Sequence, residues 1–341
     1  MQHNMKKLII ISCMTMIAFS ANAYEYKSGR NNYNISGFGT FGTINSDSQD
    51  AVYVNDWRLR GQYEYEIADK QKLGLVYCVD ALAEIENQPA HDAFIFGEDE
   101  NLGRVEFGFT DSIATKLGVG IPDVGGLRLN NYPLLYDKIA RSGGVISNTT
   151  TNSGRYRLRL NLATVRARPV QYGVSFSSFS NTYDYLTDFG IKYRMPYGKT
   201  KLALSIGGSF IDNPNGFTED IYLPATTANW RGQISSGLNL QYNSIIWGLS
   251  ARAIYDDSPI GVPSDGITAG TGISYDLLKY SVSASYVFSD TGIWDSDIDD
   301  YNAHTGILSL RYKYSKYLDL WISCGATTGT PFIGAGMRVL F

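Results

Sequence analysis

The sequence predicts an all-β fold, a 16-stranded antiparallel transmembrane β-barrel. Three observations predict it: polar and apolar residues alternate along many short segments, the connections between these segments alternate in length, and no long apolar run follows the N-terminus. A membrane-crossing helix needs about 20 apolar residues. With 44% apolar and 18% charged residues, 35 glycines and a mean hydropathy of -0.16, the composition excludes both a bundle of such helices and a disordered chain.

Residues 1–23 have the three parts of a secretory signal peptide: Lys6 and Lys7, an apolar stretch that ends at Phe19, and a small-residue cleavage site at Ala23. The stretch holds about 12 apolar residues, which is short for an anchor helix. A lipoprotein box ending at Cys13 is the other alternative, and it leaves an apolar region of about five residues. We therefore predict cleavage after Ala23. The mature chain then has 27 basic and 33 acidic residues, and its net charge of −6 argues against a nucleic-acid partner.

The remaining residues, 24–341, form one predicted barrel domain. Alternation with a period of two places successive side chains on opposite faces of a strand, as Arg157, Leu158, Arg159 and Leu160 illustrate. Sixteen segments are predicted as strands, at about 33–44, 52–67, 72–83, 91–97, 103–110, 154–163, 169–178, 186–195, 200–211, 229–242, 245–256, 265–276, 279–289, 303–314, 317–327 and 332–341.

The connections between these strands sort into two kinds. Every second one is a brief turn, such as Asn243-Ser244, and the others are longer polar loops, of which Asp111 to Ser153 is the longest. Short turns on one rim, long loops on the other and an even strand count are typical of an outer-membrane barrel. One face of the strands is aliphatic with aromatic ends, and the opposite face is rich in Ser, Gly, Thr and Arg. A closed wall of sixteen strands encloses an aqueous channel by default.

The C-terminus adds a family resemblance. The last segment ends on Phe341, with Gly336 and Val339 before it. This ending, the strand count, the signal peptide and the loop order resemble the trimeric 16-stranded general-diffusion porins of Gram-negative outer membranes. The resemblance implies that Gly336, Val339 and Phe341 are presented to the barrel-insertion machinery, that the chain forms a homotrimer, and that lipid and lipopolysaccharide surround it.

The long third loop, residues 110–153, carries the second resemblance. It contains Pro122, Asp123, Val124, Gly125 and Gly126, which is similar to the turn with which the third loop of these porins folds into the barrel and narrows it. The resemblance implies that Pro122, Gly125 and Gly126 form the turn and that Asp123 is the acid of the constriction. The other predicted constriction residues are charged residues of the adjoining strands and loop: Glu106, Asp111, Arg58, Arg60, Arg104, Arg155, Arg157 and Arg159.

Opposed arginines and carboxylates orient hydrated dipolar solutes, while the bore excludes large ones. The predicted function is passive diffusion of small hydrophilic solutes and ions through a water-filled channel, without cofactor, with a slight preference for anions because the inward charges are mostly arginines. A channel selective for anions, phosphate or sugars is the alternative. A barrel enzyme is a distant one, since His91 and His304 stand in no nucleophile motif, and a soluble all-β binding protein is the remaining alternative.

An acidic run in the loop before residue 303 has the spacing of a divalent-ion clamp at Asp295, Asp297 and Asp299. It lacks the glycine and distal glutamate of a calcium-binding loop. We therefore expect a solvated outer loop there and predict no metal site.

Overall fold

The computed structural model describes residues 24–46, 49–82, 90–124, 157–164, 168–178, 185–212, 230–256, 266–291, 302–327 and 330–341. The predicted signal peptide and the acidic run at Asp295, Asp297 and Asp299 lie outside these residues. Among the residues described, no helix is long and apolar enough to cross a membrane.

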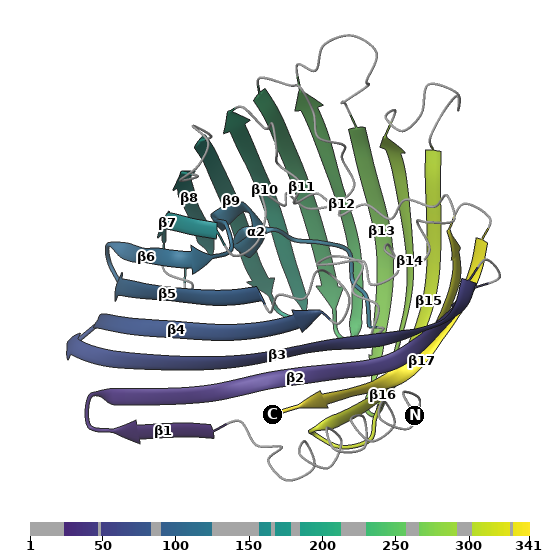
Figure 1. Cartoon of the computed structure of the whole chain (residues 1–341), viewed down its shortest axis with the longest axis horizontal. Helices are drawn as coiled ribbons and strands as arrows, with labels where there is room; N and C mark the ends of the chain where they lie inside the picture. The colour runs from purple at the N-terminus through teal and green to yellow at the C-terminus, as the bar shows by residue number, and fades with distance from the viewer. Residues whose placement is uncertain are drawn as a thin grey trace, which may run out of the picture.

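Sixteen strands form one antiparallel sheet that closes on itself, because β17 pairs with β2 from Leu340 opposite Phe38 to Phe332 opposite Ser46 (Figure 1). The closed sheet confirms the predicted fold class. Its strands are β2 (Asn31–Ser46), β3 (Gln49–Ala68), β4 (Gln71–Leu82), β5 (Ala90–Asp99), β6 (Gly103–Thr110), β7 (Arg157–Ala163), β8 (Val170–Ser178), β9 (Tyr185–Tyr197), β10 (Thr200–Asp212), β11 (Trp230–Tyr242), β12 (Ile245–Asp256), β13 (Gly266–Leu277), β14 (Tyr280–Thr291), β15 (Asn302–Lys313), β16 (Leu318–Thr327) and β17 (Thr330–Leu340).

One further strand precedes the ring and was not predicted. β1 (Tyr24–Ser28) turns at Gly29, whose φ of 58° suits glycine, and pairs with the start of β2. β1 and β17 therefore share one edge of β2. Between them the C-terminus closes the ladder: the amide of Gly37 donates to the carbonyl of Phe341 (2.6 Å), and the amide of Phe341 donates to that of Gly37 (3.0 Å).

The predicted assembly residues lie at this closure. A Cβ at Gly336 would stand 2.1 Å from the carbonyl oxygen of Phe41, so a larger residue would separate β17 from β2. Val339 pairs with Gly39 on one side and Leu318 on the other. The ring of Phe341 lies over Gly37, where a Cβ would come within 2.5 Å of it. Their recognition by insertion machinery stays a prediction.

The two faces of the sheet differ as the alternation predicts, with one correction. Outer residues such as Leu73, Leu75 and Tyr77 are about half exposed, while most buried inner residues are polar, many of them serines. The interior of β4 and β5 is not wholly wet, however. Val76, Phe94 and Phe96 point inward and pack together as a small apolar cluster. These three residues are exceptions to the mostly polar inner face that the sequence predicts, and cations lie over the two phenylalanine rings, as described below.

Candidate functional site

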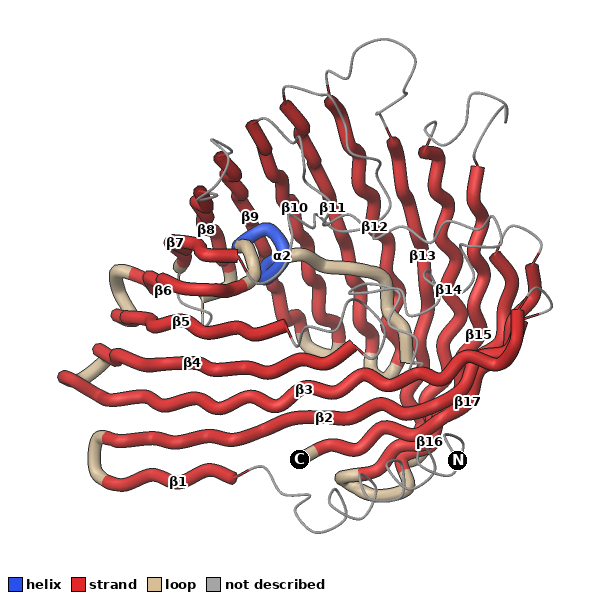
Figure 2. Tube along the Cα trace, viewed as in Figure 1, coloured by secondary structure: helices blue, strands red, loops and turns tan. Residues whose placement is uncertain are grey.

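Residues 111–124 run along the inner wall of the barrel (Figure 2), and their contacts extend from Ser175 on β8 to Ser283 and Ser285 on β14. Wall serines bind their backbone: Ser175 and Ser205 accept from the amides of Ile113 (2.7 Å) and Val119 (2.8 Å). Farther along, Ser285 donates to the carbonyl of Pro122 (2.9 Å), and Ser283 accepts from the amide of Val124 (3.1 Å). These four serines hold the first part of the predicted loop against the wall. Residues 125–153 lie outside the described residues, so the inward course of the complete loop stays a prediction.

Glycines on five consecutive strands make room for this segment. They are Gly190, Gly207, Gly237, Gly248 and Gly272, on β9 to β13 in order. We name these five residues the glycine cradle.

The fit is closest at Gly237, where a Cβ would lie 1.8 Å from the carbonyl oxygen of Val119, and at Gly248, where it would lie 2.5 Å from the ring of Pro122. Real Cβ atoms do not approach backbone so closely. Gly190, Gly237 and Gly248 are therefore steric requirements of the loop's position, whereas a Cβ at Gly207 would make only an ordinary contact of 3.5 Å with Ala114.

The loop starts with a one-turn helix, α2 (Ile113–Leu117). Ser112 caps it: its hydroxyl accepts from the amide of Thr115 at 3.2 Å. The turn directs Lys116 back toward β6. There its ammonium forms an ion pair with Glu106 and donates to the hydroxyl of Thr110 (2.7 Å).

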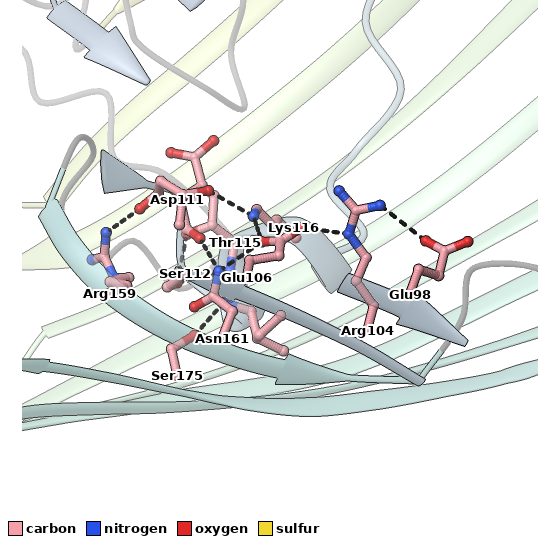
Figure 3. A network of polar contacts seen from close by, with 12 residues as sticks. Glu98, Arg104, Glu106, Asp111, Ser112, Thr115, Lys116, Arg159, Asn161 and Ser175 are labelled. Atoms are coloured by element: carbon pink, nitrogen blue, oxygen red, sulfur yellow. Dashed lines mark hydrogen bonds and ion pairs between the residues drawn. The ribbon is translucent and has the colours of Figure 1, made fainter. Parts of the chain in front are cut away.

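Glu106 is the centre of a network of buried charges at the base of the loop (Figure 3). Its carboxylate accepts from Arg104 Nε (2.8 Å) and from Asn161 Nδ2 (3.0 Å) in addition to Lys116, while its exposed fraction is only 4%. Arg104 extends the network to Glu98 at 2.9 Å. The buried carboxylate of Glu106 thus has two cations and one neutral amide as hydrogen-bond donors. A charge that is removed from water needs such partners.

The neighbouring strand β7 adds two contacts that lead to the loop backbone. Asn161 also donates to the carbonyl of Asp111 (3.0 Å), and Arg159 donates to the carbonyl of Thr110 (2.6 Å). Arg159 is fully buried, with Asp188 at 3.9 Å from its Nε. The chain is therefore fixed at the point where it leaves β6.

The inner aromatic rings lie under these cations. Arg104 stands 3.6 Å from the centre of the Phe96 ring and Lys116 stands 5.0 Å from that of Phe94, at cation–π distance. Burial lowers the pKa of the Lys116 ammonium, and the adjacent Glu106 carboxylate opposes that shift.

The predicted constriction residues divide into two groups in the structure. Glu106, Arg104, Arg159 and Asp111 belong to the network at the loop base. Arg58 and Arg60 lie half-buried on β3, where Arg60 donates to Gln62 (3.0 Å).

The other predicted site residues are farther along the loop or beyond it. Asp123 is half-buried beside Pro122 at the far end of the described segment. Arg157 begins β7 opposite Thr110. Arg155, Gly125 and Gly126 lie outside the described residues.

The sequence did not predict several residues of the site. Lys116 and Asn161 are not among the predicted site residues, and the cradle glycines and wall serines are predicted only as small residues of the inner face. The alternation of strands already placed them on the inner face. Nothing in the sequence, however, indicated that a segment some 160 residues away would lie on Ser283 and Ser285. In the part of the chain that the structure describes, no group of His, Cys, Asp or Glu residues is arranged to hold a metal ion.

Comparison of the fold with solved structures points to one class. OmpF of Salmonella typhi, in complex with daunomycin, matches 93% of this chain over its whole length with a TM-score of 0.66 and 10% identity. An anion-selective porin from Comamonas acidovorans matches 91% of this chain, again over its whole length (0.62, 13%). The trimer form of OmpT, an outer membrane protein of Vibrio cholerae, matches 91% of this chain and 99% of its own (0.64, 11%).

The fold is therefore that of the 16-stranded outer-membrane porins. No protein-family model matches the chain, and no curated protein matches its sequence.

Proposed function

We propose that the chain is an outer-membrane porin, a water-filled channel for passive diffusion of small hydrophilic solutes and ions. The observation that carries the proposal is the segment 111–124, held on the inner wall of a closed barrel by serines, a glycine cradle and a buried ion network. A barrel without a transport role has no need for a segment fixed along its inner wall. A narrowed lumen between such a segment and the opposite wall selects solutes by size.

The two groups of charged residues suggest different roles within this proposal. Glu106, Arg104 and Arg159 anchor the loop. Glu106 and Arg104 form an ion pair with each other, and Arg159 donates to the carbonyl of Thr110, where the loop begins. Asp123, Arg58 and Arg60, with Arg155 and Arg157, then line the aperture and set the transverse field. The loop turn continues from Pro122 through Gly125 and Gly126.

The setting follows from the same proposal. The chain is exported by a signal peptide cleaved after Ala23 and assembled by the barrel-insertion machinery into the outer membrane of a Gram-negative cell, where lipopolysaccharide surrounds its outer rim. The fold similarity to a trimer-form outer membrane protein supports a homotrimer.

Liposome swelling tests the function. Vesicles that contain the folded protein should swell in neutral sugars at rates that fall with sugar size and do not saturate with concentration. A saturable rate for one sugar, or for phosphate, would favour a substrate-selective channel. That second candidate has one observation in its favour: several arginines, among them Arg231, Arg252, Arg311 and Arg338, lie on the inner face of the described strands. The fold similarity to an anion-selective porin agrees with it.

A further inference from the structure

Three basic side chains form a cluster on the inner wall of β9 and β10. Lys192 and Arg194 follow the inward-facing Gly190 at alternate positions of β9. Arg194 is paired with Ala203 on β10, and Lys201 lies two positions from Ala203 on the same face. Alternate positions along one strand are about 7 Å apart, so three positive charges share a small part of the wall. We name Lys192, Arg194 and Lys201 the basic patch.

The basic patch lies directly on the short-turn side of the loop segment. Lys192 is paired across the two strands with Ser205, whose hydroxyl accepts from the amide of Val119 in that segment. Lys192 is half-buried, whereas Arg194 and Lys201 are exposed. A solute that has passed the loop from the long-loop side therefore meets the basic patch next, on its way to the short-turn end of the lumen.

The charges of the basic patch have no acidic partner. Among the residues that the structure describes, neither Lys192, Arg194 nor Lys201 forms an ion pair with a carboxylate. Like charges at adjacent positions repel one another and destabilise a sheet. A bound anion would remove that repulsion. The residues paired with the basic patch on the neighbouring strands are all neutral: Gln171, Ser205, Ala203, Pro196 and Gln241.

Two half-buried inner lysines at the same end of the lumen are, by contrast, paired with acids. Lys72 on β4 lies 3.8 Å from Glu64. Lys313 on β15 lies 3.4 Å from Asp276. Unpaired positive charge is therefore a local feature of β9 and β10 and not a general property of the short-turn end.

The chemistry of the basic patch fits an oxyanion with more than one negative charge. A guanidinium group donates two parallel hydrogen bonds to such an anion, and ammonium groups act on it as compact point charges. A phosphoryl group carries about −1.5 to −2 charges near pH 7 and three strong acceptor oxygens. Because the basic patch faces the lumen, its ligand is a dissolved solute and not a lipid headgroup.

We propose that the basic patch is a binding site for dissolved phosphate and phosphate-bearing solutes, on the short-turn side of the loop. The site rests on the channel proposed above and names a class of solute that the channel retains during passage. It does not require the aperture itself to select phosphate.

Single-channel recording in potassium chloride with added potassium phosphate, at constant ionic strength, tests the site. Phosphate should reduce the current in a saturable manner, whereas nitrate, a monovalent oxyanion, should not block. Lys192→Gln together with Arg194→Gln removes two of the three charges. Loss of two exposed charge pairs with the anion should raise the half-blocking phosphate concentration about tenfold.

Lys72→Gln together with Lys313→Gln is the matched control. It removes the same charge from the same end of the lumen, at lysines that already have acidic partners. The half-blocking concentration should change by no more than about twofold. Lys201→Gln replaces the first double variant if that variant does not fold, and it should raise the concentration about threefold.

A block that does not saturate, an equal block by nitrate, or an equal effect of the control variant would overturn the proposal, since each reports only the net charge of the lumen. Isothermal titration calorimetry of the same folded preparations in detergent separates the site from the channel. Phosphate binding that is weakened by the Lys192 and Arg194 substitutions supports the site even where no current flows. Conductance without phosphate binding overturns the site and leaves the channel standing.

Discussion

The ammonium of Lys116 forms an ion pair with the carboxylate of Glu106 across ten residues, and this pair ties the first turn of the loop to the strand that precedes it. Arg104 and Asn161 bind the same carboxylate. A buried carboxylate with three donors is held in a fixed position, because the loss of any donor leaves a buried polar group without its hydrogen-bond partner. The geometry of the lumen therefore depends on residues that do not themselves face the aperture.

Removal of the central charge should loosen this joint. Glu106→Gln removes the carboxylate paired with Lys116, while Arg104 keeps its ion pair with Glu98, and loss of one partner of a buried pair costs about 3–5 kcal/mol. We expect a lower midpoint for heat-induced unfolding on detergent gels and noisier open-channel current. Glu66→Gln is the control, since Glu66 pairs with Lys27 where both side chains are over 40% exposed, and exposed pairs contribute little. Equal destabilisation by the two variants would contradict the anchoring role.

The glycine cradle makes a steric prediction. Gly237→Ala places a methyl group where the carbonyl of Val119 lies, so the loop should move away from β11 and into the lumen. We expect lower single-channel conductance, with a stability loss of about 1–3 kcal/mol from overpacking. Gly232→Ala on the same strand has only contacts beyond 3.5 Å and should behave as the unmodified protein. Unchanged conductance in Gly237→Ala would show that the loop does not depend on the cradle.

The sequence predicts the strands and their two faces, but it does not predict the glycine cradle. Strand positions and faces follow from alternation, which is local: Leu73, Leu75 and Tyr77 alternate with inward residues and face outward. The cradle is not local. Gly190 and Gly272 are 82 positions apart in the chain and come into line only through the register of five strands, which no single-strand pattern encodes.

The sequence also did not predict β1 or the inward rings of Phe94 and Phe96. β1 has five residues and follows the predicted cleavage site directly, so its alternation was too brief to separate from the end of the signal. Phe94 and Phe96 break the polar pattern of the inner face because Lys116 and Arg104 cover their rings. Arg58, Arg60, Arg104, Arg157 and Arg159 lie on β3, β6 and β7, within the predicted segments 52–67, 103–110 and 154–163. Their division into anchoring and aperture groups required the contacts of Glu106.

Ion selectivity tests the proposed aperture group. Arg58→Glu together with Arg60→Glu should shift the reversal potential in a salt gradient toward cations, because four units of charge change on the half-buried inner face of β3. Asp123→Asn should shift it toward anions. Lys27→Glu, on the exposed β1 hairpin, serves as the charge control. If the double variant and the control shift the potential equally, Arg58 and Arg60 do not line the aperture.

Closure of the barrel depends on the terminal ring. Phe341→Ala uncovers Gly37 and removes side-chain contacts from the β2 to β17 junction, at a cost of about 1–3 kcal/mol for a partly buried aromatic. We expect a smaller fraction of heat-modifiable, folded protein after refolding in detergent. Phe210→Ala, which removes an equally large ring from an outer position that is 50% exposed, is the comparison. A folded fraction no lower for Phe341→Ala would contradict a special role for the C-terminus.

Single-channel recording in a planar lipid bilayer tests the central claim most directly. Purified, folded protein should insert in discrete conductance steps, and neutral sugars of graded size should reduce the current only while they are small enough to enter. Folded protein that inserts into the bilayer and carries no current would contradict the account.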